Sequence, residues 1–100
     1  MKISKKLYID EDVPHHKWII WKLRKNKKTE GIYCIIYKND SFLEIIKSSR
    51  IKDRYNQSVL IGIATTKENA MALLVRIFDE VYVPNPNIQH MKDYFITNNS

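Results

Sequence analysis

The segment from Ser58 to Val83 constrains the fold of this chain most, because it predicts a buried strand followed at once by an amphipathic helix. Residues 59–64 (VLIGIA) are almost wholly apolar and rich in β-branched side chains, and they are too few for a typical core helix. Thr65 and Glu68 match the capping box S/T-x-x-E, whose side chains satisfy backbone donors of a first helical turn. A helix is therefore expected directly after the strand.

The apolar residues of this helix recur with the spacing of one buried helical face. They lie at i, i+3, i+4, i+7, i+8 and i+11, namely Ala70, Leu73, Leu74, Ile77, Phe78 and Val81. Leu74 is expected at the centre of that face. Gly62, inside the strand, predicts the close approach of a helix or of another backbone.

Shorter patterns predict one helix and two strands upstream. Acidic residues precede Pro14 and basic residues follow, which favours a helix over residues 13–25. Residues 32–37 (IYCIIY) and 42–47 have strand composition and are joined by a polar turn at 38–41.

The remaining segments carry weaker patterns. Residues 48–57 form a charged link with one helical turn around 51–55. The start of the chain is either a short edge strand or a lead-in, and 84–90 (PNPNIQH) breaks regular structure. Residues 1–9 and 88–100 are expected to be loosely ordered, with a short terminal element or fraying at the end.

Together these elements predict a single α+β domain over residues 1–100, with the order α-β-β-β-α. The antiparallel sheet is expected to have at least three strands and helices on one face, so that its other face is open to solvent. Glu44 marks the exposed side, which a neighbouring strand makes partly apolar with Ile35 and with Tyr33 or Tyr37. A partly apolar open face predicts a homodimer.

Length, cysteine content and hydropathy restrict the class of protein. A chain of 100 residues with 44% apolar content can build one core. The single Cys34 excludes an internal disulfide framework, favours a reducing compartment, and is expected to be buried. Because no stretch approaches the roughly 18 apolar residues of a membrane span and the start lacks a signal-peptide core, a cytoplasmic protein without membrane contact is expected.

Positive charge is concentrated in the first half of the chain. Residues 1–54 contain 14 Lys/Arg against seven Asp/Glu, whereas residues 55–100 contain three against four. Six cations occur from Lys17 to Thr29 without an acidic residue: Lys17, Lys22, Arg24, Lys25, Lys27 and Lys28. The segment is interpreted either as a phosphate-binding surface or as a solvated helix end opposing the helix dipole, and the second interpretation is preferred.

Trp18 and Trp21 lie within this basic segment, three residues apart. The preferred interpretation is that they attach the first helix to the sheet. The alternative is a surface on which bases stack or a partner protein binds.

No catalytic, cofactor or metal site is predicted. Adjacent His15 and His16 point about 100° apart on a helix and are poorly placed to share a metal ion. His15, His16 and Glu44 are examples of acid–base candidates, without a nucleophile motif to support them. Cys34 lies among apolar strand residues, which opposes a reactive thiolate, and the two glycines are too far apart for a phosphate loop.

The predicted order resembles the α-β-β-β-α topology of the double-stranded RNA-binding domain, whose second helix begins with Ser/Thr and lysines that contact phosphates. In this chain Gly62, Thr66, Lys67 and Ala70 occupy similar places. Glu68 replaces the second lysine and Met71 the third, so the likeness is one of topology. The positive charge lies instead on the first helix.

The leading functional expectation is a non-enzymatic binding or protein-interaction module that self-associates. The alternative is binding of RNA or DNA by residues 17–28, with these side chains in contact: Lys17, Trp18, Trp21, Lys22, Arg24, Lys25, Lys27 and Lys28.

Overall fold

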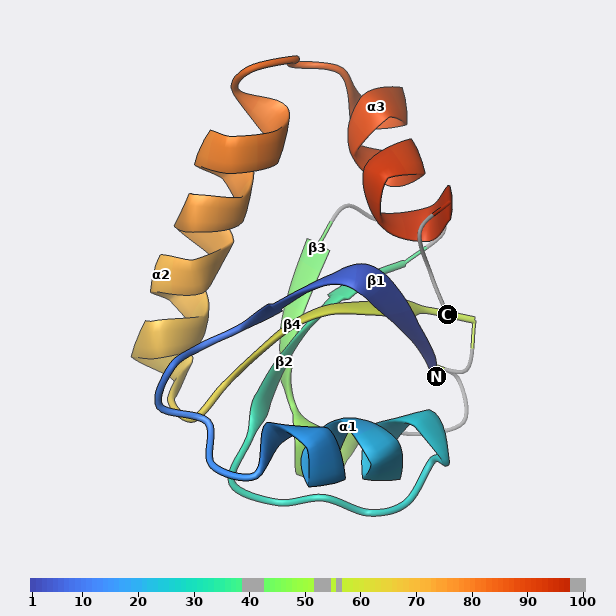
Figure 1. The fold of residues 1–100 in the computed structure, drawn as a ribbon, viewed down its shortest axis with the longest axis vertical. Helices are drawn as coiled ribbons and strands as arrows, with labels where there is room; N and C mark the ends of the chain where they lie inside the picture. The colour runs from blue at the N-terminus through green and yellow to red at the C-terminus, as the bar shows by residue number, and fades with distance from the viewer. Residues whose placement is uncertain (39–42, 52–54, 56, 98–100) are drawn as a thin grey trace.

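A four-stranded mixed sheet forms the centre of the computed structural model, which describes residues 1–38, 43–51, 55 and 57–97 (Figure 1). Its strands, in the spatial order β1-β4-β2-β3, are β1 (Lys2–Ile9), β4 (Val59–Ala64), β2 (Tyr33–Tyr37) and β3 (Leu43–Lys47). The α-helices are α1 (His16–Arg24), α2 (Lys67–Ile77) and α3 (Ile88–Lys92). The prediction of a single α+β domain is confirmed.

The predicted order α-β-β-β-α is wrong, because a strand precedes α1 and a helix follows α2. β1 pairs with β4 in parallel, while β2 pairs with β3 and β4 in antiparallel fashion. The sheet is therefore mixed rather than antiparallel, and the resemblance to the double-stranded RNA-binding domain does not hold. Of the two alternatives for the start of the chain, the edge strand is confirmed by β1. Its parallel pairing could not be predicted, since its pairing partner lies more than 50 residues further along the chain.

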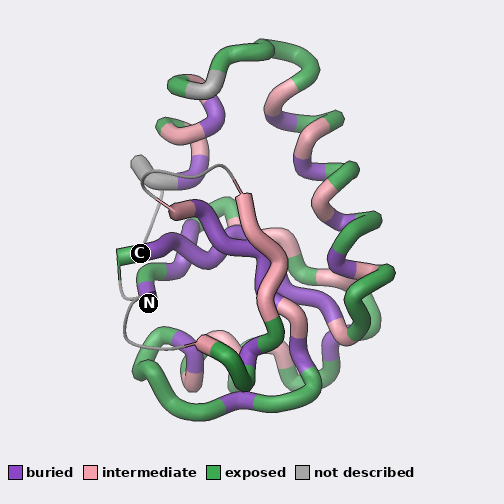
Figure 2. Tube along the Cα trace, turned by 180° about the vertical axis from the view of Figure 1, so that it is seen from behind, coloured by how far each residue is buried: buried purple, intermediate pink, exposed green. Residues whose placement is uncertain are grey.

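Helices cover both faces of the sheet, so the prediction of helices on one face is wrong. Figure 1 shows α1 below the sheet and α2 and α3 above it. Leu23 of α1 packs with Cys34 and Ile36 in one apolar cluster. The second cluster packs α2, α3 and the turn after α3 against the opposite face of the sheet. The helical segments contribute Leu73, Ile77, Met91 and Phe95, and the strands contribute Ile35, Tyr37, Val59 and Ile61. Figure 2 shows the buried residues concentrated along the central strands.

The apolar face that Glu44 was expected to expose is covered. Glu44 pairs across the strands with Ile36, and Ile36 is fully buried in the cluster that α1 completes. The argument for a dimer through an open sheet face is thereby removed. Cys34 is fully buried, as predicted.

β4 contains a β-bulge next to its glycine, and the glycine lies where two side chains approach the backbone closely. Ile35 pairs with Gly62 and Ile36 with Leu60, so Ile61 is an additional residue in the register. A Cβ on Gly62 would lie 3.1 Å from Ile35 Cδ1 and 3.3 Å from Leu73 Cδ2. The predicted close approach at Gly62 is therefore confirmed.

Helix α1 begins later than predicted because the chain turns before it. Val13 donates its backbone N–H to Asp10 and buries its side chain in the core. His15 adopts a left-handed conformation with φ of 50°, and the first helical residue is His16. The predicted helix over 13–25 is confirmed for residues 16–24.

Helix α2 is capped by Thr66 rather than by the predicted Thr65. The hydroxyl oxygen of Thr66 accepts the backbone N–H of Asn69 at 3.0 Å. Both threonines have the hydroxyl that an N-cap needs. The observed cap places Asn69 so that its side-chain amide donates to Asp10 and Asp12 after β1, at 3.2 and 3.3 Å.

The buried face of α2 centres on Leu73, not on Leu74. Ala70, Leu73 and Ile77 are buried, whereas Leu74 is half-buried. After Ile77 the backbone continues as a π-helical turn, Phe78–Tyr82, which keeps Val81 in the core.

The C-terminal segment supplies core residues that the sequence patterns did not indicate. Asn87 caps α3 by accepting the backbone N–H groups of Gln89 and His90. A second π-helical turn, Asp93–Thr97, follows. Met91 and Phe95 are fully buried against the sheet.

Two predicted features fall largely outside the described residues. These are most of the turn at 38–41 with the following Phe42, and the helical turn around 51–55. Ser48–Arg50 forms a single 3-10 turn directly after β3. Among the helices described, none is both long and apolar enough to cross a membrane.

Replacing Leu73 by Ala should lower the free energy of unfolding by about 2 to 5 kcal/mol, because it leaves a cavity above Gly62. Leu74→Ala is the matched control and should cost less, since Leu74 is only half-buried. Urea denaturation of both variants measures the difference. An equal or larger loss for Leu74→Ala would contradict the observed orientation of α2.

Candidate functional site

Trp18 and Trp21 lie on the outside of the molecule. Trp18 is 58% exposed and Trp21 41% exposed. Their rings stack on each other with centroids 5.1 Å apart and an interplanar angle of 15°. The preferred interpretation, in which both residues attach α1 to the sheet, is therefore wrong.

Smaller apolar residues attach the helix instead. Leu23 is 3% exposed, and Ile19 and Ile20 pack partly buried against the same cluster. Since successive helical residues rotate by about 100°, positions 18 and 21 fall on the side opposite this buried face. The irregular apolar pattern of α1 thus contains a buried face of aliphatic residues and an exposed pair of indoles.

A lysine lies over each indole. Lys22 Nζ is 5.6 Å from the centroid of the Trp18 ring, and Lys27 Nζ is 5.6 Å from that of Trp21. Both distances are within the range of a cation–π contact. We call these four side chains, Trp18, Trp21, Lys22 and Lys27, the tryptophan–lysine surface.

The C-terminus of α1 positions Lys27 through its backbone. Asn26 adopts the left-handed conformation with φ of 56°. The N–H of Asn26 bonds to the carbonyl of Leu23 at 3.1 Å, and the N–H of Lys27 bonds to that of Lys22 at 2.8 Å. These are the two bonds of a Schellman motif, which reverses the chain after a helix. The reversal returns Lys27 to the side of the helix that carries Trp21.

The other predicted contact residues are less closely associated. Lys17, Arg24 and Lys25 are exposed on or directly after α1. Lys28 lies 3.7 Å from Glu30 in an exposed ion pair. The structure therefore joins four of the eight predicted residues by direct contacts and places the other four nearby in the chain.

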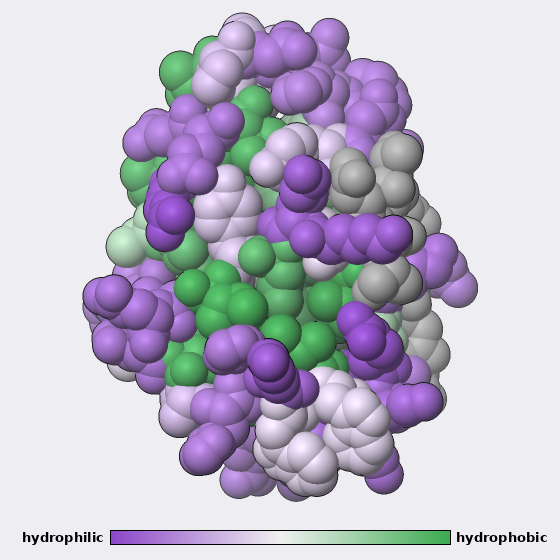
Figure 3. Space-filling model, in the orientation of Figure 1, coloured by the Kyte–Doolittle hydropathy of each residue, from purple (hydrophilic) through white to green (hydrophobic). Residues whose placement is uncertain are grey.

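The tryptophan–lysine surface belongs to a face of mixed character. In Figure 3 pale side chains of intermediate hydropathy gather over α1, next to an apolar area in the middle of the face. Leu7, Ile19 and Ile20 are half-buried between β1 and α1, and Ile9 is 36% exposed. Hydrophilic side chains surround this area in the same view.

The residues considered for catalysis are not assembled into a site. Burial raises the pKa of the Cys34 thiol to about 12, which opposes a reactive thiolate. Glu44 forms an ion pair with Lys38. Within the described residues, no three His, Cys, Asp or Glu side chains are grouped so that they could hold a metal ion.

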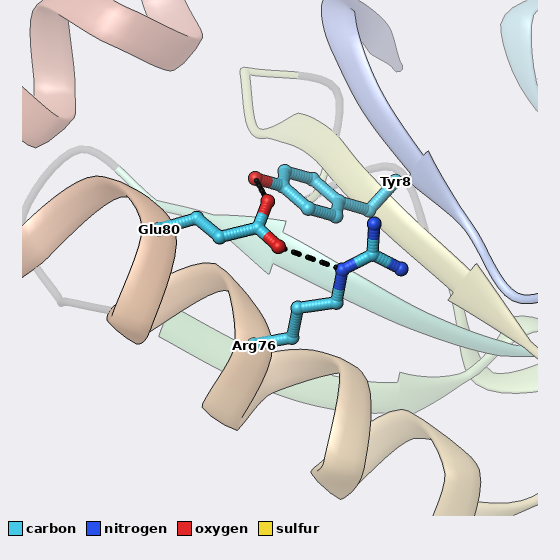
Figure 4. Close-up of polar contacts among 3 residues, drawn as sticks. All are labelled: Tyr8, Arg76 and Glu80. Atoms are coloured by element: carbon cyan, nitrogen blue, oxygen red, sulfur yellow. Dashed lines mark hydrogen bonds and ion pairs between the residues drawn. The ribbon is translucent and has the colours of Figure 1, made fainter.

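A polar cluster connects β1 to the end of α2. Tyr8 donates its hydroxyl to Glu80 Oε1 at 2.8 Å, and Arg76 Nε donates to Glu80 Oε2 at 2.9 Å (Figure 4). These hydrogen bonds, from Arg76 first and from Tyr8 second, lower the pKa of the Glu80 carboxyl. Burial and the same carboxylate raise the pKa of Tyr8. With both oxygens of Glu80 occupied, we interpret this cluster as a structural contact.

A cavity of about 580 Å³ lies along β3 and brings together residues that no sequence pattern had placed in one site. Its polar lining comes from several elements: Tyr33, Glu44, Lys47, Arg50, Tyr55 and Lys67. Because these residues are spread over 35 positions, no local motif could have indicated them.

Comparisons of the chain with protein-family models, with curated proteins and with solved structures found no match.

Replacing Asn26 by Ala should lower the free energy of unfolding by about 1 kcal/mol, because alanine tolerates the left-handed region less well than asparagine and lacks the side-chain oxygen that accepts the Met1 amino group at 2.6 Å. Asn26→Gly is the matched control and should retain more stability, since glycine adopts this conformation readily. Thermal denaturation compares the two variants. If Asn26→Gly were the less stable variant, backbone conformation would not be the dominant contribution of Asn26.

Glu80 should contribute stability that depends on pH. Its folded pKa is lowered, so the contribution is present above its unfolded pKa and is lost as the pH falls through the folded pKa. The stability difference between the wild type and Glu80→Gln should therefore shrink between about pH 7 and pH 2.5. Urea denaturation at several pH values measures it, with Glu68→Gln as the control on the same helix. A difference that does not change with pH would contradict this assignment.

Proposed function

We propose that this protein is a non-enzymatic module that binds single-stranded nucleic acid through the tryptophan–lysine surface. The observation that carries the proposal is the exposed, stacked pair Trp18 and Trp21 with one lysine over each ring. Aromatic platforms beside cations are the usual means by which proteins hold single strands without reading their sequence.

A nucleic-acid base interacts more strongly with each indole than the lysine that lies over it. An exposed cation–π contact contributes about 0.5 to 1 kcal/mol, whereas a base stacked on an aromatic side chain contributes about 1 to 3 kcal/mol. A base can therefore displace the ammonium of Lys22 or Lys27 from its ring. The displaced ammonium remains close to the phosphate of the same nucleotide.

Exposed indoles favour a single strand over a duplex. In a duplex the bases are stacked on one another and their faces are not available to a protein side chain. Unpaired bases offer a π-face to Trp18 and Trp21 at no cost of unpairing. Cations without exposed aromatic residues would support duplex and single-strand binding alike.

The remaining cations of the segment extend the positive region around the two indoles. Lys17, Arg24 and Lys25 are exposed and belong to or border α1. Phosphate contacts from such residues release counterions, so affinity must fall as the salt concentration rises. If the segment is only a solvated helix end, no nucleic-acid binding is expected. Binding that weakens as salt is added would therefore distinguish the two interpretations of this segment.

Self-association is the weaker alternative, since the structure covers the sheet face that motivated it. The exposure of two indoles needs another explanation. A tryptophan side chain that enters a core buries about 150 to 250 Å² of surface, and these two side chains forgo much of that burial. A nucleic-acid base supplies the flat apolar surface that would cover them.

Trp18→Ala and Trp21→Ala should each weaken binding of a fluorescein-labelled dT12 oligonucleotide by about 5- to 100-fold, because each removes a stacking platform. Lys22→Gln with Lys27→Gln should weaken it and flatten its salt dependence. Met71→Ala, which removes an exposed apolar side chain from α2, is the control for the indoles, and Lys92→Gln is the control for charge. Fluorescence anisotropy at about 50 mM and 200 mM salt measures all variants.

Absence of dT12 binding at tens of micromolar protein in 50 mM salt would refute the proposal. Equal affinity for dT12 and for a labelled duplex would refute the single-strand preference. Binding to anionic phosphatidylglycerol vesicles without binding to dT12 would replace nucleic acid by a membrane surface.

A further inference from the structure

The two edges of the sheet differ in how they are protected against a further strand. β1 forms one edge with an irregular register between Ile3 and Tyr8, and Lys6 lies over the Tyr94 ring of the C-terminal segment at 5.6 Å. Irregular register, edge lysines and covering segments all hinder edge pairing. β3 forms the other edge, and its five residues pair with β2 without a register shift.

The hydrogen-bond pattern shows which backbone groups of β3 point away from the sheet. Ser48 donates its N–H to the carbonyl of Ile32 at 2.9 Å, so these residues form a hydrogen-bonded pair at the end of the ladder. Hydrogen-bonded and non-hydrogen-bonded pairs alternate in an antiparallel ladder. Leu43, Ile45 and Lys47 therefore direct their N–H and C=O groups to the outer edge.

The cavity of about 580 Å³ follows this edge. Its lining includes Ile45 and Lys47 from one face of β3 and Glu44 and Ile46 from the other. Because β3 is an edge strand and residues from both of its faces line the cavity, we place the cavity along this edge. A chain placed in it would occupy the position of a fifth strand.

The charge of the cavity favours an acidic occupant. Lys47, Arg50 and Lys67 line it, and in the described part of the chain no carboxylate forms an ion pair with any of them. Among the described residues that line the cavity, Glu44 is the one acidic residue, and it is paired with Lys38. Three cations thus remain beside a row of outward backbone donors and acceptors.

We propose that the edge of β3 binds an extended acidic segment of a partner protein, which adds to the sheet as a fifth strand. Backbone hydrogen bonds to Leu43, Ile45 and Lys47 supply the pairing, as in other cases of strand addition. Carboxylates of the segment face Lys47, Arg50 and Lys67. This site is separate from the tryptophan–lysine surface and does not depend on it.

A second copy of this chain matches the edge less well. Antiparallel pairing of β3 with itself about Ile45 would place Lys47 opposite Leu43 of the other copy. Of the described cavity residues, Glu44 is the one that could bring a carboxylate to Lys47, Arg50 and Lys67 of the other copy, and Glu44 already has a partner. An acidic segment neutralises all three cations.

The test uses a labelled ten-residue peptide that alternates glutamate with threonine. Two control peptides carry lysine in place of glutamate, or proline in place of every second threonine. The full-length protein should bind the glutamate peptide and neither control, because the first control reverses the charge and the second removes backbone donors. Binding should weaken as salt is added.

Two protein variants separate the backbone contribution from the charge contribution. Ile45→Pro removes an outward N–H without removing a bond to β2, and Ile45→Ala is its control because it loses a similar side chain but keeps the N–H. Ile45→Pro should bind the glutamate peptide at least about tenfold more weakly than Ile45→Ala. Lys67→Glu should also weaken binding by about tenfold, and it keeps the proposal testable if Ile45→Pro does not fold; Lys5→Glu on β1 is its control.

Equal affinity for the glutamate and lysine peptides, or equal affinity of Ile45→Pro and Ile45→Ala, would overturn the proposal. Displacement of the glutamate peptide by dT12 would overturn it as well, since the groove would then accept any polyanion. A dimer in sedimentation that Ile45→Pro abolishes would show that a second copy occupies the edge, and would also overturn it.

Discussion

Pairing of β4 on both of its edges is the constraint on which the rest of the structure depends. All six residues of β4 are buried, with β1 on one side and β2 on the other. A strand in this position must be apolar throughout, since helices cover both of its faces. The bulge at Ile61 adds one residue to the strand and brings Gly62 beneath Leu73 of α2.

The attachment of α1 explains how this small domain can expose two tryptophans. The helix has nine residues and reaches the core mainly through Leu23, with Ile19 and Ile20 partly buried. Its opposite side makes no contribution to the core and can carry Trp18 and Trp21 without loss of packing. The Schellman motif at Asn26 then adds Lys27 to the same side. One side of this short helix thus contributes to the core, and the opposite side carries the proposed binding surface.

The candidate surfaces differ in how far the sequence could indicate them. Trp18, Trp21, Lys22 and Lys27 lie within ten consecutive residues, so their composition was visible, but whether the indoles face inward or outward was not. The five apolar or aromatic residues between positions 18 and 23 fit no single period, and only packing against the sheet shows which of them are buried. The groove at β3 was not visible at all, because Tyr33, Lys47 and Lys67 come together only when three elements fold.

By itself the sequence determined those features that follow from local hydrogen bonding and periodicity. These are the strand and helix over residues 59–77, the helix around Trp18, the burial of Cys34 and the close approach at Gly62. Only the tertiary structure decided that residues 2–9 pair with β4, that both faces of the sheet are covered and that the indoles are exposed. The physical reason is that strand pairing and helix placement depend on contacts between residues far apart in the chain. A period of 2 or 3.6 residues shows that a face will be buried, but it does not show what will cover it.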